Sequence, residues 1–131
     1  MPDVSAAEVV QAWLDAANSQ NIDRLVALSD PGIEIVGPRG SGHGHQLLRD
    51  WLGRAGLHLE TMRVFARGNA VVVTQHGVWR SVEMGDVIGE QYVASRFVVE
   101  EDRVSRFARH DALDEALAAA GLTVEDEIVD T

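Results

Sequence analysis

The stretch from Asp102 to Leu122, DRVSRFARHDALDEALAAAGL, carries most of the information on how this chain folds. It reads as a strand that ends at His110 and Asp111 and turns directly into a short apolar helix. Gly121 and Leu122 supply a helix stop. If a pocket opens at that end of a sheet, His110 and Asp111 lie at its mouth.

Two helices are predicted at the start of the chain. Ser5 and Glu8 form a capping box, and one helix face carries Val9, Val10, Trp13, Leu14 and Ala17. Asn21 can cap a second, shorter helix, which ends at the turn signal Asp30-Pro31-Gly32. The pattern indicates an antiparallel helical hairpin.

The rest of the chain up to the quoted stretch is mostly strand-like. A short strand at 33–36 and a flexible glycine-rich loop at 37–44 precede a third helix that begins at His45. Strands are predicted at 57–67, 70–79, 90–99 and 103–109, and their short links indicate an antiparallel meander. We therefore expect an α+β fold in which helices cover one face of a curved sheet.

Length and composition limit the possible functions. The 131 residues predict one domain (core 5–122, acidic tail 123–131), with the tail frayed or loosely packed through Ile128 and Val129. A net charge of −10, with arginine as the only basic residue type, argues against nucleic acid and membrane surfaces as partners. The chain lacks cysteine and lysine, which excludes thiolate and Schiff-base chemistry. No signal-peptide pattern is present, so we expect a cytoplasmic protein, and we expect no cofactor.

The order of these elements, and above all the strand, Asp111 and short helix of DRVSRFARHDALDEALAAAGL, resembles the NTF2-like superfamily and its SnoaL-like group. The resemblance covers residues 5–122. It implies a cone-shaped curved antiparallel sheet wrapped around an N-terminal helical hairpin and a third helix, and homodimers formed through the outer sheet face. The superfamily includes polyketide cyclases, ketosteroid isomerase, limonene-epoxide hydrolase and members that only bind ligands, so the fold alone does not fix the function.

The resemblance also implies roles for individual residues. In SnoaL-like cyclases a late Asp is the general base, and Asp111 matches that position best. The chain's single tyrosine, Tyr92, lies too late for the early helical tyrosine of ketosteroid isomerase. Arg96 and Asp111 match two members of the Asp-Arg-Asp set of the epoxide hydrolase, but no clear third member is present.

The residue types and their positions allow two interpretations of Asp111 and two of Arg96. Asp111 is either a general base with a raised pKa or only the N-cap of the last helix. His110 beside it orients a water or is a half-exposed strand end. Arg96 lies mid-strand on one face with Tyr92, and it either marks an anion- or carbonyl-binding pocket or forms a cross-strand ion pair.

Further candidates lie on the neighbouring strand and the helices. Alternation places Gln75 and Trp79 on one strand face and His76 on the other, so one face would line a pocket and the other an interface. Trp13, Trp51 and Trp79 either wall a ring-shaped ligand or belong to the core. His43 and His45 form an H-x-H pair without a third ligand at recognisable spacing, so no metal site is predicted.

Two functions remain from the sequence. The favoured one is a cavity that binds a small cyclic or hydrophobic ligand without turnover. The alternative is a small cofactor-independent enzyme, of cyclase, isomerase or epoxide-hydrolase type. It would use Asp111 as general base, assisted by His110, with Arg96 and Tyr92 holding a developing oxyanion.

Overall fold

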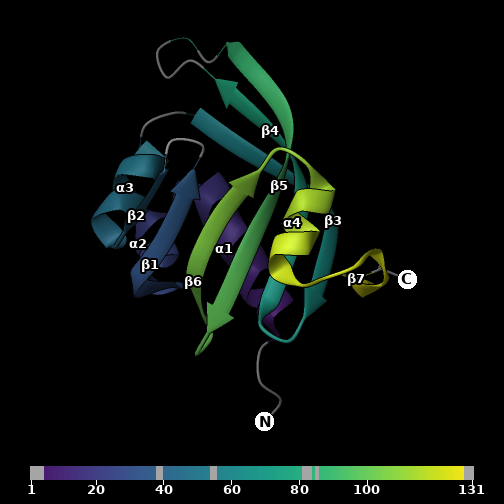
Figure 1. Ribbon diagram of the computed structural model, residues 1–131. Coiled ribbons are helices and arrows are strands. Elements are labelled where there is room, and N and C mark those ends of the chain that lie inside the picture. Colours follow the sequence, from purple (N-terminus) through teal and green to yellow (C-terminus); the bar gives the residue numbers. More distant parts are fainter. Residues whose placement is uncertain (1–4, 38–39, 54–55, 81–83, 85, 129–131) are drawn as a thin grey trace.

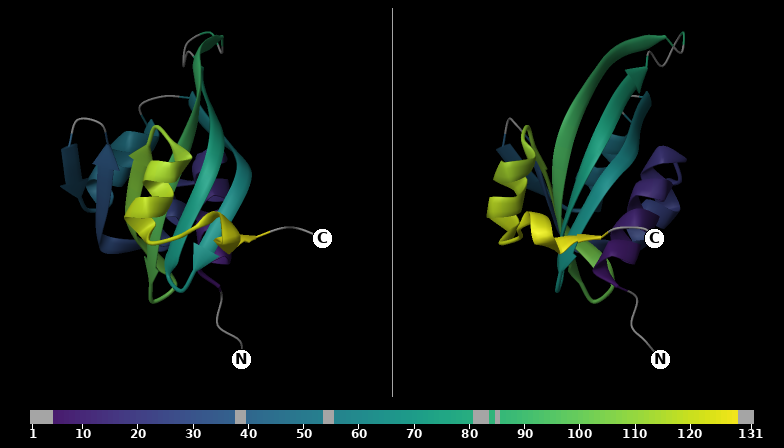
Figure 2. Two further views of the ribbon diagram at one scale, coloured as in Figure 1. Left: turned by 45° about the vertical axis from the view of Figure 1, so that its right-hand side comes forward. Right: turned by 90° about the vertical axis from the view of Figure 1, so that its right-hand side faces the viewer.

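The computed structural model describes residues 5–37, 40–53, 56–80, 84 and 86–128 and has three layers, with a seven-stranded sheet in the middle (Figures 1 and 2). Its elements are α1 (Ala6–Asn18), α2 (Ile22–Ala27), β1 (Ser29–Gly37), β2 (Gly40–His43), α3 (His45–Gly53), β3 (Gly56–Arg67), β4 (Ala70–Arg80), β5 (Val87–Glu100), β6 (Arg103–His110), α4 (Leu113–Ala120), the 3-10 turn η1 (Val124–Asp126) and β7 (Glu127–Ile128). The predicted α+β class with a curved sheet is confirmed.

The sheet has the strand order β2-β1-β6-β5-β4-β3-β7. The β3, β4, β5 and β6 strands pair antiparallel with their sequence neighbours, as predicted. In addition, β1 pairs parallel with β6, because the helical hairpin returns the chain to the far side of the meander. The loop predicted at 37–44 contains a strand instead, since β2 pairs antiparallel with β1.

The first helix begins at the predicted N-cap, Ser5, and packs on the predicted face. The Ser5 hydroxyl accepts a 3.2 Å hydrogen bond from the backbone N–H of Glu8. At its other end, the Asn18 side chain donates to the carbonyl of Leu59 (2.9 Å) and accepts from the Leu59 N–H (2.8 Å). These two bonds fix the end of α1 against β3.

The last helix lies on the sheet face opposite α1 (Figure 2). One core cluster joins α1 to inward residues such as Val71, Val73 and Phe97. A second cluster joins Ala116 and Leu117 of α4 to the other face of the sheet. The expectation that helices cover one face is therefore wrong for α4, because alternation makes β4 apolar on both faces and each face needs a cover.

The start of α4 also differs from the prediction. Ala112 is the N-cap residue, with extended backbone and no side-chain cap hydrogen bond, so the reading of Asp111 as N-cap is wrong. Two residues, Asp111 and Ala112, are needed to carry the chain from β6 onto α4, and this shifts the cap by one position. The predicted stop is confirmed: Gly121 is left-handed (φ 73°), and the Leu122 N–H donates to the Leu117 carbonyl at 2.9 Å.

The acidic tail is docked as far as residue 128. Arg63 donates two hydrogen bonds to the Glu127 carboxylate, at 3.0 and 2.8 Å, and β7 adds to the edge of β3. Ile128 is half exposed there, and Val129 lies outside the described residues. Within the described part of the chain, none of the helices is both long and apolar enough to span a membrane.

Candidate functional site

A buried polar pair lies on the α1 face of the sheet. The Ser95 hydroxyl donates a 2.6 Å hydrogen bond to the carboxamide oxygen of Gln75, and both residues are almost fully buried. The Gln75 amide nitrogen has no hydrogen-bond partner among the described residues. Gln75 was predicted as a ligand contact, and it presents an unused donor beneath the helices.

Polar groups continue from this pair toward the surface. The β5–β6 register places Arg109 directly opposite Ser95. A terminal nitrogen of Arg109 donates to the side-chain oxygen of Gln91 at 3.2 Å. Gln91 is exposed and Arg109 half-buried, so a polar row leads from solvent to Gln75.

Ser95, Gln91 and Arg109 were not predicted as site residues. Alternation along QYVASRFVV already places Gln91 and Ser95 on the face opposite Arg96. The sequence therefore contained a signal that Gln91 and Ser95 share one face of the strand. The pairing of Ser95 with Gln75 and with Arg109 depends on the strand register, which the sequence pattern leaves open.

Trp13 belongs to the apolar core on the same face of the sheet. Its side chain is 0% exposed, and its ring packs against Phe97 (centroids 5.4 Å apart) and Phe107 (5.2 Å). The indole N–H donates to the Ser29 hydroxyl at 2.9 Å. Trp51 and Trp79, predicted to wall the ligand with Trp13, have their backbones in α3 and β4, but their side chains lie outside the described residues.

The other predicted site residues lie on the α4 side of the sheet. Pairing of Val72 with Arg96 and of His76 with Tyr92 puts these residues on the face opposite Gln75. The predicted alternation is thus confirmed. Tyr92 is 66% exposed, and its ring stacks on that of His76 with centroids 4.8 Å apart.

Asp111 and Tyr92 border one hollow of about 130 Å³ next to the first turn of α4. Its described lining residues are Met62, Thr74, Gln75, Tyr92, Val93, Ala94, Asp111 and Leu113. The Thr74 hydroxyl lies there, buried and without a hydrogen-bond partner in the described structure. The Nε2 atom of His110 is likewise buried and unpartnered within the described ranges, but neither His110 nor Arg96 is among the described residues of this lining.

Arg96 takes part in no hydrogen bond or ion pair with any described residue, and its Nε atom is buried. Burial lowers the pKa of its guanidinium, the neighbouring charge of Arg106 lowers it further, and Glu34 partly offsets both. The cross-strand ion pair considered for Arg96 is thus not formed among the described residues.

The two histidines of the H-x-H pair, His43 and His45, contact different residues. The Nε2 atom of His43 lies 3.7 Å from a carboxylate oxygen of Glu34, and that of His45 lies 3.1 Å from the carbonyl oxygen of Ser29. In the described part of the chain, no group of three or more His, Cys, Asp or Glu side chains is placed to hold a metal ion.

The model of one protein family, the SnoaL-like domain, matches residues 10–107. This chain is a member of the SnoaL-like domain family. The expected NTF2-like resemblance is confirmed by solved structures with the same fold. An uncharacterised cystatin-fold protein from Novosphingobium aromaticivorans is 21% identical with a TM-score of 0.72, over 82% of this chain and 99% of that chain.

Two further solved structures are similar to this SnoaL-like domain. An LEH-like epoxide hydrolase of M. tuberculosis is 21% identical, with a TM-score of 0.69 and 88% of each chain covered. TerC, co-crystallised with polyporic acid, is 16% identical, with a TM-score of 0.70 over 88% of this chain and 96% of that chain. At these identities the likeness concerns the fold. No protein of curated function matches this SnoaL-like domain.

Proposed function

We propose that this SnoaL-like domain binds a small cyclic or hydrophobic molecule between the sheet and its N-terminal helices. An oxygen atom of the ligand accepts a hydrogen bond from the Gln75 amide. Arg109 and Gln91 lie at the solvent end of the same polar row and contact the outer part of the ligand.

The unpartnered amide nitrogen of Gln75 carries this proposal. A buried polar group without a partner costs about 1–3 kcal/mol, so a fold keeps one where something else satisfies it. The surroundings on this face are apolar and aromatic, with Trp13, Phe97 and Phe107 in mutual contact. An apolar wall with one fixed donor suits a ring that carries a carbonyl or hydroxyl oxygen.

Polyporic acid, with which TerC was co-crystallised, is a suitable first probe. Binding is measured by calorimetry for the wild type and for Gln75→Leu, in which the amide is replaced by an apolar side chain of similar size. Thr74→Val is the matched control, because Thr74 is the next residue on β4 and also has a buried, unpartnered oxygen, but on the α4 face.

We expect Gln75→Leu to weaken binding about 5- to 100-fold, as for the loss of one buried hydrogen bond, and Thr74→Val to leave it unchanged. A panel of other cyclic ketones and phenols is tested in the same way. Equal affinities for wild type and Gln75→Leu across every ring that binds, or no binding by any ring, would refute the proposal.

The hollow beside α4 supports a second candidate, a proton-transfer enzyme. Asp111 and Tyr92 border the same hollow, whose volume of about 130 Å³ is close to that of a cavity that holds one benzene ring. The Asp111 carboxylate would take a proton from a carbon next to a carbonyl, and the electron pair would move to the carbonyl oxygen as an enolate. Tyr92 would donate a hydrogen bond to that oxygen.

Solvent deuterium exchange into a cyclic 1,3-diketone, followed by NMR, tests this second candidate. Asp111→Asn should abolish enzyme-dependent exchange, while Asp114→Asn, an exposed neighbour with the same charge change, should not. Identical exchange rates in both variants, or no exchange with the wild type, would exclude the base role.

We also propose that the domain forms a homodimer through the exposed apolar side chains of the β3–β5 region. Met62 is 56%, Tyr92 66% and Val87 51% exposed, and a group of exposed large apolar side chains is the kind of surface that protein interfaces use. Sedimentation analysis of Met62→Glu and Tyr92→Glu should show monomers if this surface is the interface. A wild type that sediments as a monomer would refute the dimer.

A further inference from the structure

Arg96 has a positive charge that no described residue neutralises by direct contact. Its side chain rises from the middle of β5 on the α4 face, is half-buried, and has a buried Nε atom without an acceptor in the described structure. A partly buried charge that lacks a partner destabilises a fold, so its presence mid-strand calls for a counter-charge.

A second arginine lies beside it on the neighbouring strand. The β5–β6 register pairs Arg96 with Ala108 and Val98 with Arg106, which makes the two arginines diagonal neighbours on one face. Side chains in this relation start about 7–8 Å apart, a separation that two long arginines can close around one small group. The two positive charges repel each other, and the charge of Arg106 contributes to the lowered pKa of the Arg96 guanidinium.

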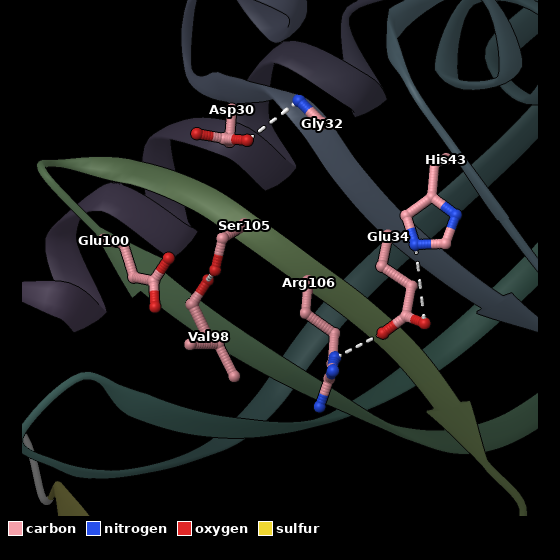
Figure 3. A pocket seen from close by; sticks show the side chains of 8 residues that line it. All are labelled: Asp30, Gly32, Glu34, His43, Val98, Glu100, Ser105 and Arg106. Carbon is pink, nitrogen blue, oxygen red and sulfur yellow. Dashed lines mark hydrogen bonds and ion pairs between the residues drawn. The ribbon is translucent and has the colours of Figure 1, made fainter.

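Glu34, the carboxylate whose charge acts on Arg96, is already engaged by other residues. One of its oxygens lies 2.6 Å from Nε of Arg106 and the other 3.7 Å from Nε2 of His43 (Figure 3). Neither oxygen bonds Arg96. The terminal nitrogens of Arg106 make no hydrogen bond within the described ranges, and its side chain is 44% exposed. Glu34 therefore neutralises Arg106 by direct contact and leaves Arg96 without a contacting carboxylate.

An open hollow of about 390 Å³ lies at this place, which is within the size range of small-molecule sites. Its described lining residues are Asp30, Gly32, Glu34, His43, Val98, Glu100, Ser105 and Arg106; Arg96, the diagonal neighbour of Arg106, lies beside this lining and is not part of it. In Figure 3, Arg106, Glu34 and His43 gather at one end, and Asp30 and Glu100 lie toward the other. The hollow thus has Arg106 and His43, both paired with Glu34, at one end and the Asp30 and Glu100 carboxylates toward the other.

We propose that this hollow binds a small polar molecule through an oxyanion, a carboxylate or phosphate group, that Arg106 holds in the hollow and that Arg96 reaches from its diagonal position beside Arg106. Guanidinium groups bind such oxygens with strong, paired hydrogen bonds. Hydroxyl or amino groups of the same molecule would donate to Asp30 and Glu100 at the far end. The site lies on the face opposite Gln75 and does not depend on ligand binding there.

Inorganic phosphate and citrate, titrated into the full-length protein and followed by NMR, test this site. We expect saturable binding of at least one anion, weakened about tenfold or more by Arg96→Gln and by Arg106→Gln. Arg49→Gln is the control, since Arg49 is an exposed arginine on α3 and its loss changes the net charge equally. No saturable binding of either anion, or equal weakening by Arg49→Gln, would overturn the proposal.

If Arg96→Gln loses anion binding, two more measurements show whether the substitution acts through the anion site. In anion-free buffer Arg96→Gln should melt at the same temperature as the wild type or higher, because it removes an unpaired charge. A lower melting temperature would show that Arg96 already has a stabilising partner. If sedimentation shows that Arg96→Gln dissociates a dimer, a second copy of the chain supplies the counter-charge and the anion site is refuted.

Discussion

The Ser95 hydroxyl and the Gln75 carboxamide are joined by a 2.6 Å hydrogen bond on the buried α1 face of the sheet. The bond uses the oxygen of Gln75 and leaves its amide nitrogen without a partner among the described residues. It also holds the carboxamide in one orientation, so that the free N–H groups point in a fixed direction.

This hydrogen bond predicts that removing one partner destabilises the fold and that removing both nearly restores its stability. Ser95→Ala removes the only described bond of a buried carboxamide and should lower the free energy of unfolding by about 1–3 kcal/mol. The double variant Ser95→Ala/Gln75→Leu removes both polar groups and should return to within about 1 kcal/mol of the wild type. Urea denaturation measures both. A double variant as unstable as the single one would contradict the account.

The link between α1 and β3 gives a second prediction. Asn18→Ala removes two hydrogen bonds to the backbone of Leu59 and should lower the free energy of unfolding by about 2 kcal/mol. The amide hydrogen of Leu59 should then exchange faster with solvent. Gln11→Ala, which removes only an exposed bond to Asp15, should cost about 0.5 kcal/mol or less. Similar losses for the two variants would show that the link to Leu59 is unimportant.

Trp13 is predicted to stabilise the core whether or not a ligand is bound. Trp13→Ala removes a fully buried ring in contact with Phe97 and Phe107 and should lower the free energy of unfolding by about 3–5 kcal/mol. Tyr92→Ala, at a mostly exposed ring, should cost about 1 kcal/mol or less. Thermal unfolding followed by circular dichroism distinguishes them, and a Trp13→Ala loss below that of Tyr92→Ala would contradict a core role.

Docking of the tail should depend on pH. The hydrogen bond from Arg63, helped by its charge, holds the pKa of the Glu127 carboxyl below its ordinary value. Because the folded pKa is lowered, this contribution is complete above the unfolded pKa and is lost as the pH falls through the folded pKa. The stability difference between wild type and Arg63→Gln should therefore be larger at neutral pH than at about pH 3. Equal differences at both pH values would contradict the pairing.

Much of this fold could be predicted from local patterns. Ser5 begins α1 because its hydroxyl satisfies a free backbone N–H, and Gly121 ends α4 because it adopts a left-handed conformation. Strand alternation correctly separated Gln75 from His76 and grouped Arg96 with Tyr92, although it did not say which face the N-terminal helices cover. These features depend on neighbouring residues only.

The site depended on contacts that no local pattern contains. The cap of α4 is at Ala112, because the path of the chain across the end of the sheet decides where the helix can begin. Ser95, Arg109 and Arg106 gained their partners through strand register, and Glu34 reached Arg106 through the parallel pairing of β1 with β6. Contacts between residues so far apart in the sequence are fixed by tertiary packing.

The most direct test of ligand binding on the helix-covered face is a crystal structure of the protein with polyporic acid or the tightest-binding ring of the panel. The account predicts a ring on the α1 face of the sheet, with a ligand oxygen within hydrogen-bonding distance of the Gln75 amide nitrogen. A ring seated in the hollow beside α4, with the Gln75 amide bonded to water or protein, would contradict it.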